Sequence, residues 1–260
     1  MLLLLKLTLS PLLIVIVTLV TRRWGMAVGG WLASLPINAG PILLFFALEQ
    51  GTAFAASAAQ FTISSVVGVA TSCLAYGWIA QRFNWSICLL GAWAVFFATV
   101  ALLRLVPMPL VPALVVSVAA LYSARKLLPV VGPVAVSASR PRLDLPMRIV
   151  ATLALILTLT YLAGWLGPRL SGLLTAFPVA SAVVGAFSHA QQGRDAAVSF
   201  FRGMLGGMHG FCIFCAVLSL TLQPYGVMVA FALALSAQAV IHGLSLWLRQ
   251  RELRTAHANA

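Results

Sequence analysis

Acidic residues are scarce in this sequence, which has four Asp and Glu against 16 Lys and Arg, giving a formal net charge of +12. Charged residues of both signs make up 8% of the chain, whereas hydrophobic residues make up 62%. A soluble protein of this length must cover its core with more polar surface than these residues supply. The composition therefore excludes a soluble globular protein and predicts an integral membrane protein.

The same scarcity removes most catalytic chemistry. Four carboxylates in 260 residues leave few pairs for general acid–base catalysis or for magnesium binding. The sequence also lacks the zinc-protease helix motif, the glycine-rich phosphate loop and the nucleophile elbow of hydrolases. We therefore expect a protein that is not an enzyme and needs no cofactor. The alternative of an intramembrane enzyme needs a second catalytic group beside His209, Cys212 or Glu49.

Cysteine is equally rare, and all four cysteines, at positions 73, 88, 212 and 215, fall within apolar runs. This placement gives no sign of an extracellular disulfide framework. The spacing His209-x-x-Cys212-x-x-Cys215 puts three potential ligands within one fan on a helix. Zinc or copper would need further ligands from elsewhere in the chain. We interpret the cysteines as small packing residues and expect no metal site.

Long apolar runs are what the sequence has in place of charge, and the mean hydropathy is +1.05. Charged and turn residues divide the chain into nine runs that are suited to crossing a bilayer. The pattern predicts an all-α polytopic membrane protein with about nine transmembrane helices, short loops and a single membrane domain. The predicted helices cover residues 2–21, 26–48, 53–80, 86–104, 108–124, 147–166, 169–188, 195–222 and 225–248.

Basic residues separate onto two sides when nine spans are counted. One side collects thirteen of them and the other collects Lys6, Arg104 and Arg169. Because cytoplasmic loops carry the excess of Lys and Arg, the N-terminus is predicted outside and the C-terminus inside, in the inner (plasma) membrane. This explanation of the positive charge needs no nucleic acid, so the expected partners are membrane lipids. Association into a homo-oligomer is left open.

An internal repeat relates the two halves of the chain. Residues Gly30–Cys73 align without a gap with Gly172–Cys215, and 10 of the 44 pairs are identical. About 4 identities would arise by chance in so apolar a sequence. An odd number of crossings separates the copies, so they are predicted to be inverted, as in many secondary transporters. The predicted parts are a first repeat (1–104), a fifth helix with a basic cytoplasmic linker (105–146), a second repeat (147–248) and a cytoplasmic tail (249–260).

Matched prolines near the middle of two predicted helices are the best candidates for a binding site. Pro36 lies in the run 26–48, and Pro178 lies at the aligned place in the run 169–188. Proline kinks or breaks a helix, and the freed carbonyls need a partner inside a membrane. The alternative is an ordinary kink with close helix packing. The predicted substrate-binding residues are Ser34, Pro36, Asn38, Pro41, Thr175, Pro178 and Ser181.

Polar residues at helix ends and at membrane depth are candidates for gating or coupling. Glu49 and Gln191 occupy aligned positions at the two predicted mouths, and Gln60 and His209 lie inside helices. His209 is a plausible proton carrier, since histidine titrates near neutral pH. Each residue also has a structural interpretation, as a helix stop, a solvated residue or a packing hydrogen bond. His242 and Gln238, four residues apart on one helix face, form a weaker candidate pair.

These features together predict a secondary transporter that moves a small neutral or amphipathic solute by alternating access around the helices broken at Pro36 and Pro178. Proton coupling is the expected form of coupling, because carboxylates at membrane depth are missing. One alternative is a flippase for a lipid or a lipid-linked carrier. Another is a non-transporting scaffold or assembly factor, in which the small-residue segment Gly203–Gly210 would pack against a partner.

Overall fold

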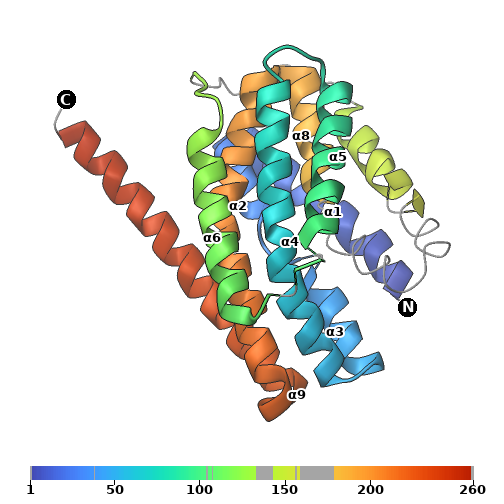
Figure 1. Ribbon diagram of the computed structural model, residues 1–260. Coiled ribbons are helices and arrows are strands. Elements are labelled where there is room, and N and C mark those ends of the chain that lie inside the picture. Colours follow the sequence, from blue (N-terminus) through green and yellow to red (C-terminus); the bar gives the residue numbers. More distant parts are fainter. Residues whose placement is uncertain are drawn as a thin grey trace.

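The computed structural model describes residues 2–37, 39–103, 105–106, 108–132, 143–155, 157–158 and 179–258. Within these residues the secondary structure is entirely helical, as the composition predicts (Figure 1). The helices are α1 (Leu2–Trp24), α2 (Met26–Ala33), α3 (Ala39–Glu49), α4 (Thr52–Ile79), α5 (Trp85–Leu103), α6 (Leu110–Leu127), α8 (Val179–Gln192) and α9 (Arg194–Ala258). Residues 144–155 form a further helix between α6 and α8.

The helix lengths and compositions agree with a membrane protein. In the described part of the chain, α4, α5, α6 and the stretch Arg194–Leu244 of α9 are long and apolar enough to cross a bilayer. The stretch within α9 consists of two helical segments, because Gly226 has φ 75° and ψ 175° and interrupts the helix. The chain reverses direction there (Figure 1). This break matches the predicted boundary between the runs 195–222 and 225–248.

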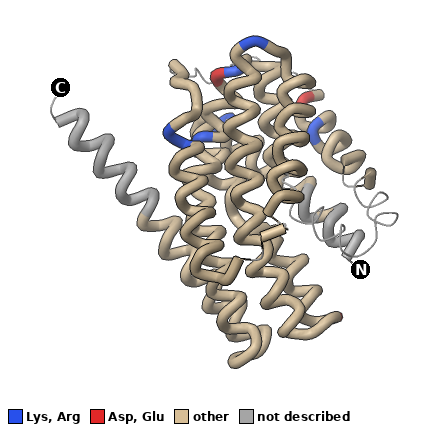
Figure 2. The backbone as a smooth tube through the Cα atoms, in the orientation of Figure 1, with Lys and Arg blue, Asp and Glu red and all other residues tan. Residues whose placement is uncertain are grey.

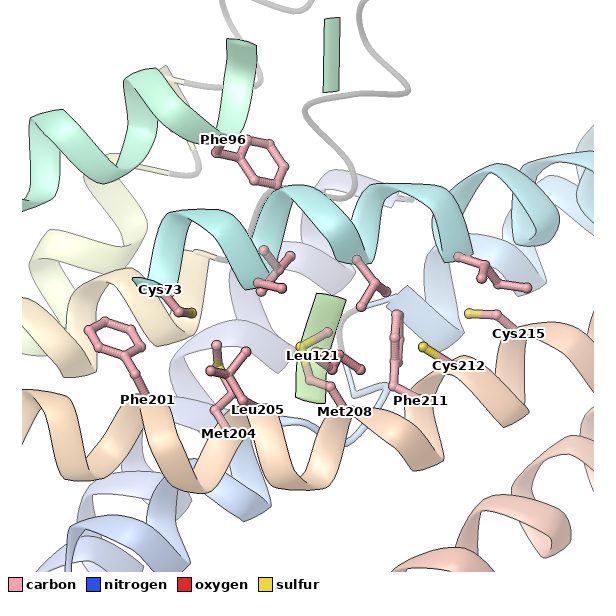
Figure 3. Close-up of a cluster of buried hydrophobic side chains, with 14 of the residues drawn as sticks. Cys73, Phe96, Leu121, Phe201, Met204, Leu205, Met208, Phe211, Cys212 and Cys215 are labelled. Carbon is pink, nitrogen blue, oxygen red and sulfur yellow. The ribbon is translucent and has the colours of Figure 1, made fainter. Parts of the chain in front are cut away.

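Helix α4 lies at the centre of the bundle and packs against α5, α6 and the first segment of α9, residues 194–225. Figure 3 shows the side chains that fill the space between α4 and this segment of α9. Cys73 comes from α4, and Met208, Cys212 and Cys215 come from α9. All are buried, so the cysteines serve as small core residues in a continuous apolar interior.

Four helix reversals are made by a single glycine with a positive φ angle: Gly25, Gly51, Gly193 and Gly226. Their φ angles lie between 75° and 91°, and ψ is near 160–175° at the three for which it is given. Side-chain-bearing residues are almost never found in this region, so glycine is required for such short connections. Gly51 and Gly193 are an aligned pair of the internal repeat.

The helices that follow these two glycines also correspond in the repeat, and they lie antiparallel. The chain after α4 meets the start of α9, where Arg194 Nη1 lies 3.5 Å from the carbonyl oxygen of Gln81. The two helices run in opposite directions along their shared interface (Figure 1). An inverted repeat requires this orientation. The helix that should correspond to α2 falls in residues 159–178, outside the described part, so the complete repeat stays a prediction.

The described basic residues gather at one end of the bundle, which we call the basic end (Figure 2). Helix α6 ends there, and Arg202 of α9 donates hydrogen bonds to the carbonyl oxygens of Arg125, Leu128 and Pro129. The basic side chains that the structure describes are Arg22, Arg23, Arg82, Arg125, Lys126, Arg148, Arg194 and Arg202. Their segregation is the pattern that orients a protein in a bilayer.

Candidate functional site

The predicted helix 26–48 is interrupted at the place where the prolines stand. Helix α2 ends at Ala33, a turn follows, and α3 begins at Ala39. Pro36 cannot donate to the carbonyl of Leu32, which accepts a 3.1 Å hydrogen bond from the backbone N–H of Leu35 instead. The N–H of Gly40 then bonds to the carbonyl of Pro36 at 2.7 Å and restarts the helical pattern.

Glycines bring the end of α2 into direct backbone contact with α9. A Cβ atom at Gly30 would come within 2.0 Å of the carbonyl oxygen of Phe200, and one at Gly203 would meet the carbonyl of Ala27 equally closely. Gly207 faces Ser34 in the same way. The small-residue segment of α9 therefore packs inside this chain, against α2, as small residues do in membrane interfaces.

A buried polar cluster lies where α2 ends, and we call it the Ser34 cluster. Ser34 Oγ donates a 2.6 Å hydrogen bond to the carbonyl of Trp31 and lies 3.3 Å from His242 Nε2 in the second segment of α9, residues 227–258. The rings of Trp31 and His242 contact each other at an interplanar angle of 54°, with their centroids 4.8 Å apart. Gly210 leaves room for the imidazole, because a Cβ there would lie 2.2 Å from His242 Nδ1. The cluster links the helix break to both segments of α9.

A cavity of about 520 Å³ adjoins the break on the side away from the basic end. This volume falls within the range of small-molecule binding sites. Phe214 and Phe231, whose ring centroids are 6.2 Å apart, form part of its wall. The lining residues are Leu35, Pro36, Ile37, Gly40, Pro41, Leu44, Phe214, Phe231, Leu235, Gln238 and Ala239. The wall is thus made of the broken helix on one side and of α9 on the other.

Among the described lining residues, Gln238 is the only one with a polar side chain. Its side chain is 2% exposed, and neither its Nε2 nor its Oε1 atom has a hydrogen-bond partner among the described residues. It lies one helical turn from His242, so the Ser34 cluster and the cavity are adjacent. A buried amide without partners costs free energy, typically about 1–3 kcal/mol per unsatisfied group. Such a residue inside a membrane helix is a candidate for a functional position.

The predicted substrate-binding residues are partly brought together. Pro36 and Pro41 line the cavity, and Ser34 lies just behind it. Ser181 is buried in α8 and is not among the described lining residues; the described wall facing Pro36 comes from α9. The other three predicted residues, Asn38, Thr175 and Pro178, lie outside the described residues. Helix α8 begins at Val179, immediately after the second proline.

Three of the predicted gating or coupling residues, Gln60, His209 and Glu49, are not among the described lining residues of the cavity. Gln60 Nε2 donates a 3.1 Å hydrogen bond to the carbonyl of Met108, in the proline-rich connection before α6. His209 Nδ1 lies 3.3 Å from the carbonyl of Gly206 in its own helix. Glu49 is exposed at the end of α3. These contacts agree with the structural interpretations of Gln60 and His209 and place neither residue at the cavity wall.

Gln191, the fourth predicted gating residue, belongs to a charged network at the basic end. Asp144 Oδ1 accepts hydrogen bonds from Arg148 Nε at 2.8 Å and from Gln191 Nε2 at 2.5 Å. Asp144 Oδ2 accepts a 2.7 Å bond from Arg22 at the end of α1. Asp144 and Arg148 are only 3% and 2% exposed. We call this set the Asp144 network; it joins α1, the helix 144–155 and α8.

The charge of Asp144 is stabilised by its partners. Burial by itself raises the pKa of this carboxyl, but the hydrogen bond and positive charge of Arg148 and the hydrogen bonds from Arg22 and Gln191 outweigh burial. The pKa therefore lies below its ordinary value, and the group is ionised at neutral pH. The guanidinium of Arg148 also lies over the ring of Phe187 in α8, 5.2 Å from its centroid.

Two features of the site escaped the sequence interpretation. The meeting of His242 with Ser34 joins residues that are 208 positions apart, and no pattern along the chain signals it. The Asp144 network had one available signal, because Asp144 and Arg148 are spaced four residues apart, as salt-bridge pairs on a helix are. From the sequence, Arg22 and Arg148 were interpreted only as signals of membrane topology.

Comparison with other proteins adds no further assignment, since no protein-family model, no curated protein and no solved structure matches this chain. Within the described residues, His, Cys, Asp and Glu side chains form no group of three that could hold a metal ion. The site therefore has to be interpreted from its own geometry.

Proposed function

We propose that this protein is a secondary transporter of the membrane, which moves a small neutral or amphipathic solute around the break between α2 and α3. One observation carries the proposal: a helix is interrupted within the bundle, and its break borders a cavity that holds a buried amide without partners. Discontinuous helices beside a cavity are the usual means by which transporters form a site at membrane depth.

The two ends of the bundle support an alternating-access mechanism. At the basic end the Asp144 network ties α1, the helix 144–155 and α8 together. The cavity lies in the other half. We therefore assign this conformation to a state that is closed at the basic end. In the opposite state the Asp144 network would be broken. The two antiparallel helices, α4 and the first segment of α9, would then each take up the arrangement that the other has here.

For proton coupling we propose His242 in place of His209. His242 contacts Ser34 at the helix break and the ring of Trp31, so a change in its charge would act directly on the end of α2. His209 contacts only a carbonyl of its own helix in the interactions described above. Replacing His242 by Asn is expected to alter the pH dependence of the conformational equilibrium measured below. The matched variant His209→Asn is expected to leave it unchanged.

The two rival functions make different use of the same features. A scaffold would display a small-residue stripe to a partner, but the stripe around Gly203 is occupied by α2 of this chain. A lipid flippase requires a polar route for a headgroup and an apolar one for a chain. The mainly apolar cavity wall suits an apolar or amphipathic cargo, so transport of a lipid-like molecule remains within the proposal.

Distance measurements between spin labels test alternating access without knowledge of the cargo. One pair, Arg23→Cys with Ala190→Cys, reports on the basic end, and a second pair, Gln50→Cys with Gln223→Cys, reports on the other end. All four positions are exposed, and the four native cysteines are buried and should not react. Double electron–electron resonance in lipid nanodiscs is expected to give two distances for each pair.

The two distance distributions must also respond in opposite directions. Asp144→Asn weakens closure of the basic end, so the longer distance there should gain population while the Gln50–Gln223 pair shifts to its shorter distance. A single narrow distance at both ends, unchanged by Asp144→Asn, would contradict transport and favour a scaffold. Asp195→Asn serves as the control, because the ion pair of Asp195 in the described structure is with the exposed Arg194, at 3.4 Å.

A further inference from the structure

We infer that the cavity beside Pro36 takes molecules with an apolar body and one neutral group that both donates and accepts a hydrogen bond. Primary amides and undissociated carboxylic acids belong to this class. The inference deepens the proposed function and rests on it, since it names the class of cargo for the same site. It is argued from the cavity wall, from Gln238 and from the surface around the opening.

The wall first requires an apolar body. Ten of the eleven described lining residues carry no polar side-chain atom, and they include the large side chains of Phe214, Phe231 and Leu44. Apolar groups of a ligand gain free energy by leaving water for such a wall, at about 25 cal/mol per Å² buried. Sugars, polyols and other molecules with many hydroxyl groups would lose their hydrogen bonds to water without replacement.

The wall also excludes a charged group. No Lys, Arg, Asp or Glu is among the described lining residues. The described basic side chains lie at the basic end (Figure 2), and Glu49 is exposed at the end of α3. An ion in the cavity would lack a counter-charge, which is expensive at membrane depth. A carboxylate, a phosphate or a quaternary ammonium group is therefore disfavoured.

Gln238 selects the remaining polar group. Its carboxamide has an acceptor oxygen and a donor nitrogen, and both are buried without partners in the described structure. A ligand amide or carboxylic acid can satisfy both atoms with a pair of parallel hydrogen bonds. An ester or a ketone accepts only and leaves Oε1 unpaired. Both amide atoms are buried behind the surface of the cavity wall. A ligand therefore reaches them when the Gln238 side chain changes rotamer and turns toward the cavity.

The edge of the cavity indicates that the molecule enters from the bilayer. Leu235 and Ala239 line the cavity and are themselves exposed on the second segment of α9. Their neighbours Leu233 and Val240 are exposed and apolar as well. Such a surface contacts hydrocarbon in a membrane protein, so the approach to the cavity is apolar. This favours an amphiphile that has already partitioned into the lipid over a solute that arrives from water.

Photo-crosslinking with a matched set of probes tests the inference. The full-length protein in nanodiscs is irradiated with twelve-carbon probes that carry a diazirine on the chain and end in a primary amide, a methyl ester, a carboxylate at pH 8 or a trimethylammonium group. The amide is expected to label peptides containing Phe214 or Phe231 about tenfold more than the other probes, as one lost hydrogen bond implies. Unlabelled dodecanamide should compete better than methyl dodecanoate.

Two variants attribute the preference to Gln238. Gln238→Leu should remove the difference between amide and ester while the protein remains folded, since no hydrogen bond is lost. Gln60→Leu is the matched control, because Gln60 is a membrane glutamine bonded to Met108; it should retain the tenfold preference. Equal labelling by amide and ester in the wild type, or an unchanged preference in Gln238→Leu, would overturn the inference. The wild-type competition decides the matter even if a variant fails to fold.

The outcomes separate this inference from the proposed function. Photo-crosslinking measures binding alone, and the spin-label distances measure conformational exchange alone. An amide preference with a single distance at each end would leave a binding protein that does not transport. Two distances without an amide preference would leave a transporter whose cargo belongs to another class, and the inference would be wrong.

Discussion

The two ends of this helical bundle are held in different ways. At the basic end, buried charges and glycine contacts fix α1, α2, α8 and the start of α9 in close proximity. In the other half, a broken helix borders a cavity, and an amide lacks partners. Ion pairs close the first region, although Arg148 Nη1 and Ser188 Oγ there also have no partner among the described residues. What distinguishes the second region is that its unpartnered amide borders a cavity. In the proposed mechanism the first half is the closed side of the protein and the second half receives the ligand.

Asp144→Asn is expected to have the largest effect on the difference between the two ends of the bundle. The substitution leaves Arg148 buried without its negative partner, and loss of one member of a buried ion pair typically costs about 3–5 kcal/mol. The free energy of unfolding, measured by denaturant titration in mixed micelles, should fall by that amount. Asp195→Asn, which affects an exposed pair, should change it by less than about 1 kcal/mol. Equal effects of the two variants would show that the Asp144 network contributes little to closure.

Acid should produce the same weakening gradually. Because the pKa of Asp144 is held below its ordinary value of 3.8, the folded state binds fewer protons than the unfolded state at acidic pH. The stability it contributes is complete above the ordinary pKa and is lost as the pH falls through the lower folded value. The difference in unfolding free energy between wild type and Asp144→Asn should therefore be constant near neutral pH and shrink on acidification. A difference independent of pH would contradict this account.

Glycine contacts provide the next test of the tight region. Gly30→Ala forces a methyl group against the carbonyl of Phe200, and overpacking of this kind costs about 1–3 kcal/mol, or more where backbone cannot move. The matched variant Gly243→Ala meets nothing within 4 Å and lies in a helix, so it should stabilise the protein by up to about 1 kcal/mol. Thermal unfolding in detergent should show the two variants shifting in opposite directions.

The paired reversals test the relation between the two halves. Gly51→Ala and Gly193→Ala each place a side chain at a φ angle near 90°, which costs about 1–3 kcal/mol. Because the two glycines occupy aligned positions, their effects on the unfolding free energy should be similar. Gly132→Ala, in open space and without a positive φ angle, should have a much smaller effect. Clearly unequal costs at positions 51 and 193 would weaken the structural equivalence of the two halves.

The smallest expected change in unfolding free energy is at Gln238, in the cavity half, and it is an increase rather than a decrease. Gln238→Leu removes two buried atoms without partners and should raise the unfolding free energy by about 1–2 kcal/mol. A polar residue that is retained although it destabilises the fold is typical of a functional site. Destabilisation by this variant would indicate that the amide has a structural partner.

The helices were predictable from sequence because each depends on local properties. The run 53–80 became α4 (Thr52–Ile79), and Gly226 separates the two predicted C-terminal crossings, since hydropathy and turn residues act within one segment. The break at Pro36 followed from the missing N–H of proline. The contacts that build the site could not be predicted, because they depend on which helix faces meet. Sequence alone gave His209 and His242 similar chemistry, and only packing places His242 against Ser34.

The single-glycine reversals also determine how motion can spread through the bundle. A connection of one or two residues leaves adjoining helices with few torsion angles by which to move independently. Helix α8 and the first segment of α9 should therefore shift as a coupled pair, as should α3 and α4. Release of Gln191 from Asp144 at one surface would thus be carried along a stiff rod of helix to Phe214, at the wall of the cavity. Because the turns are so short, motion at one surface of the bundle is mechanically coupled to motion at the other.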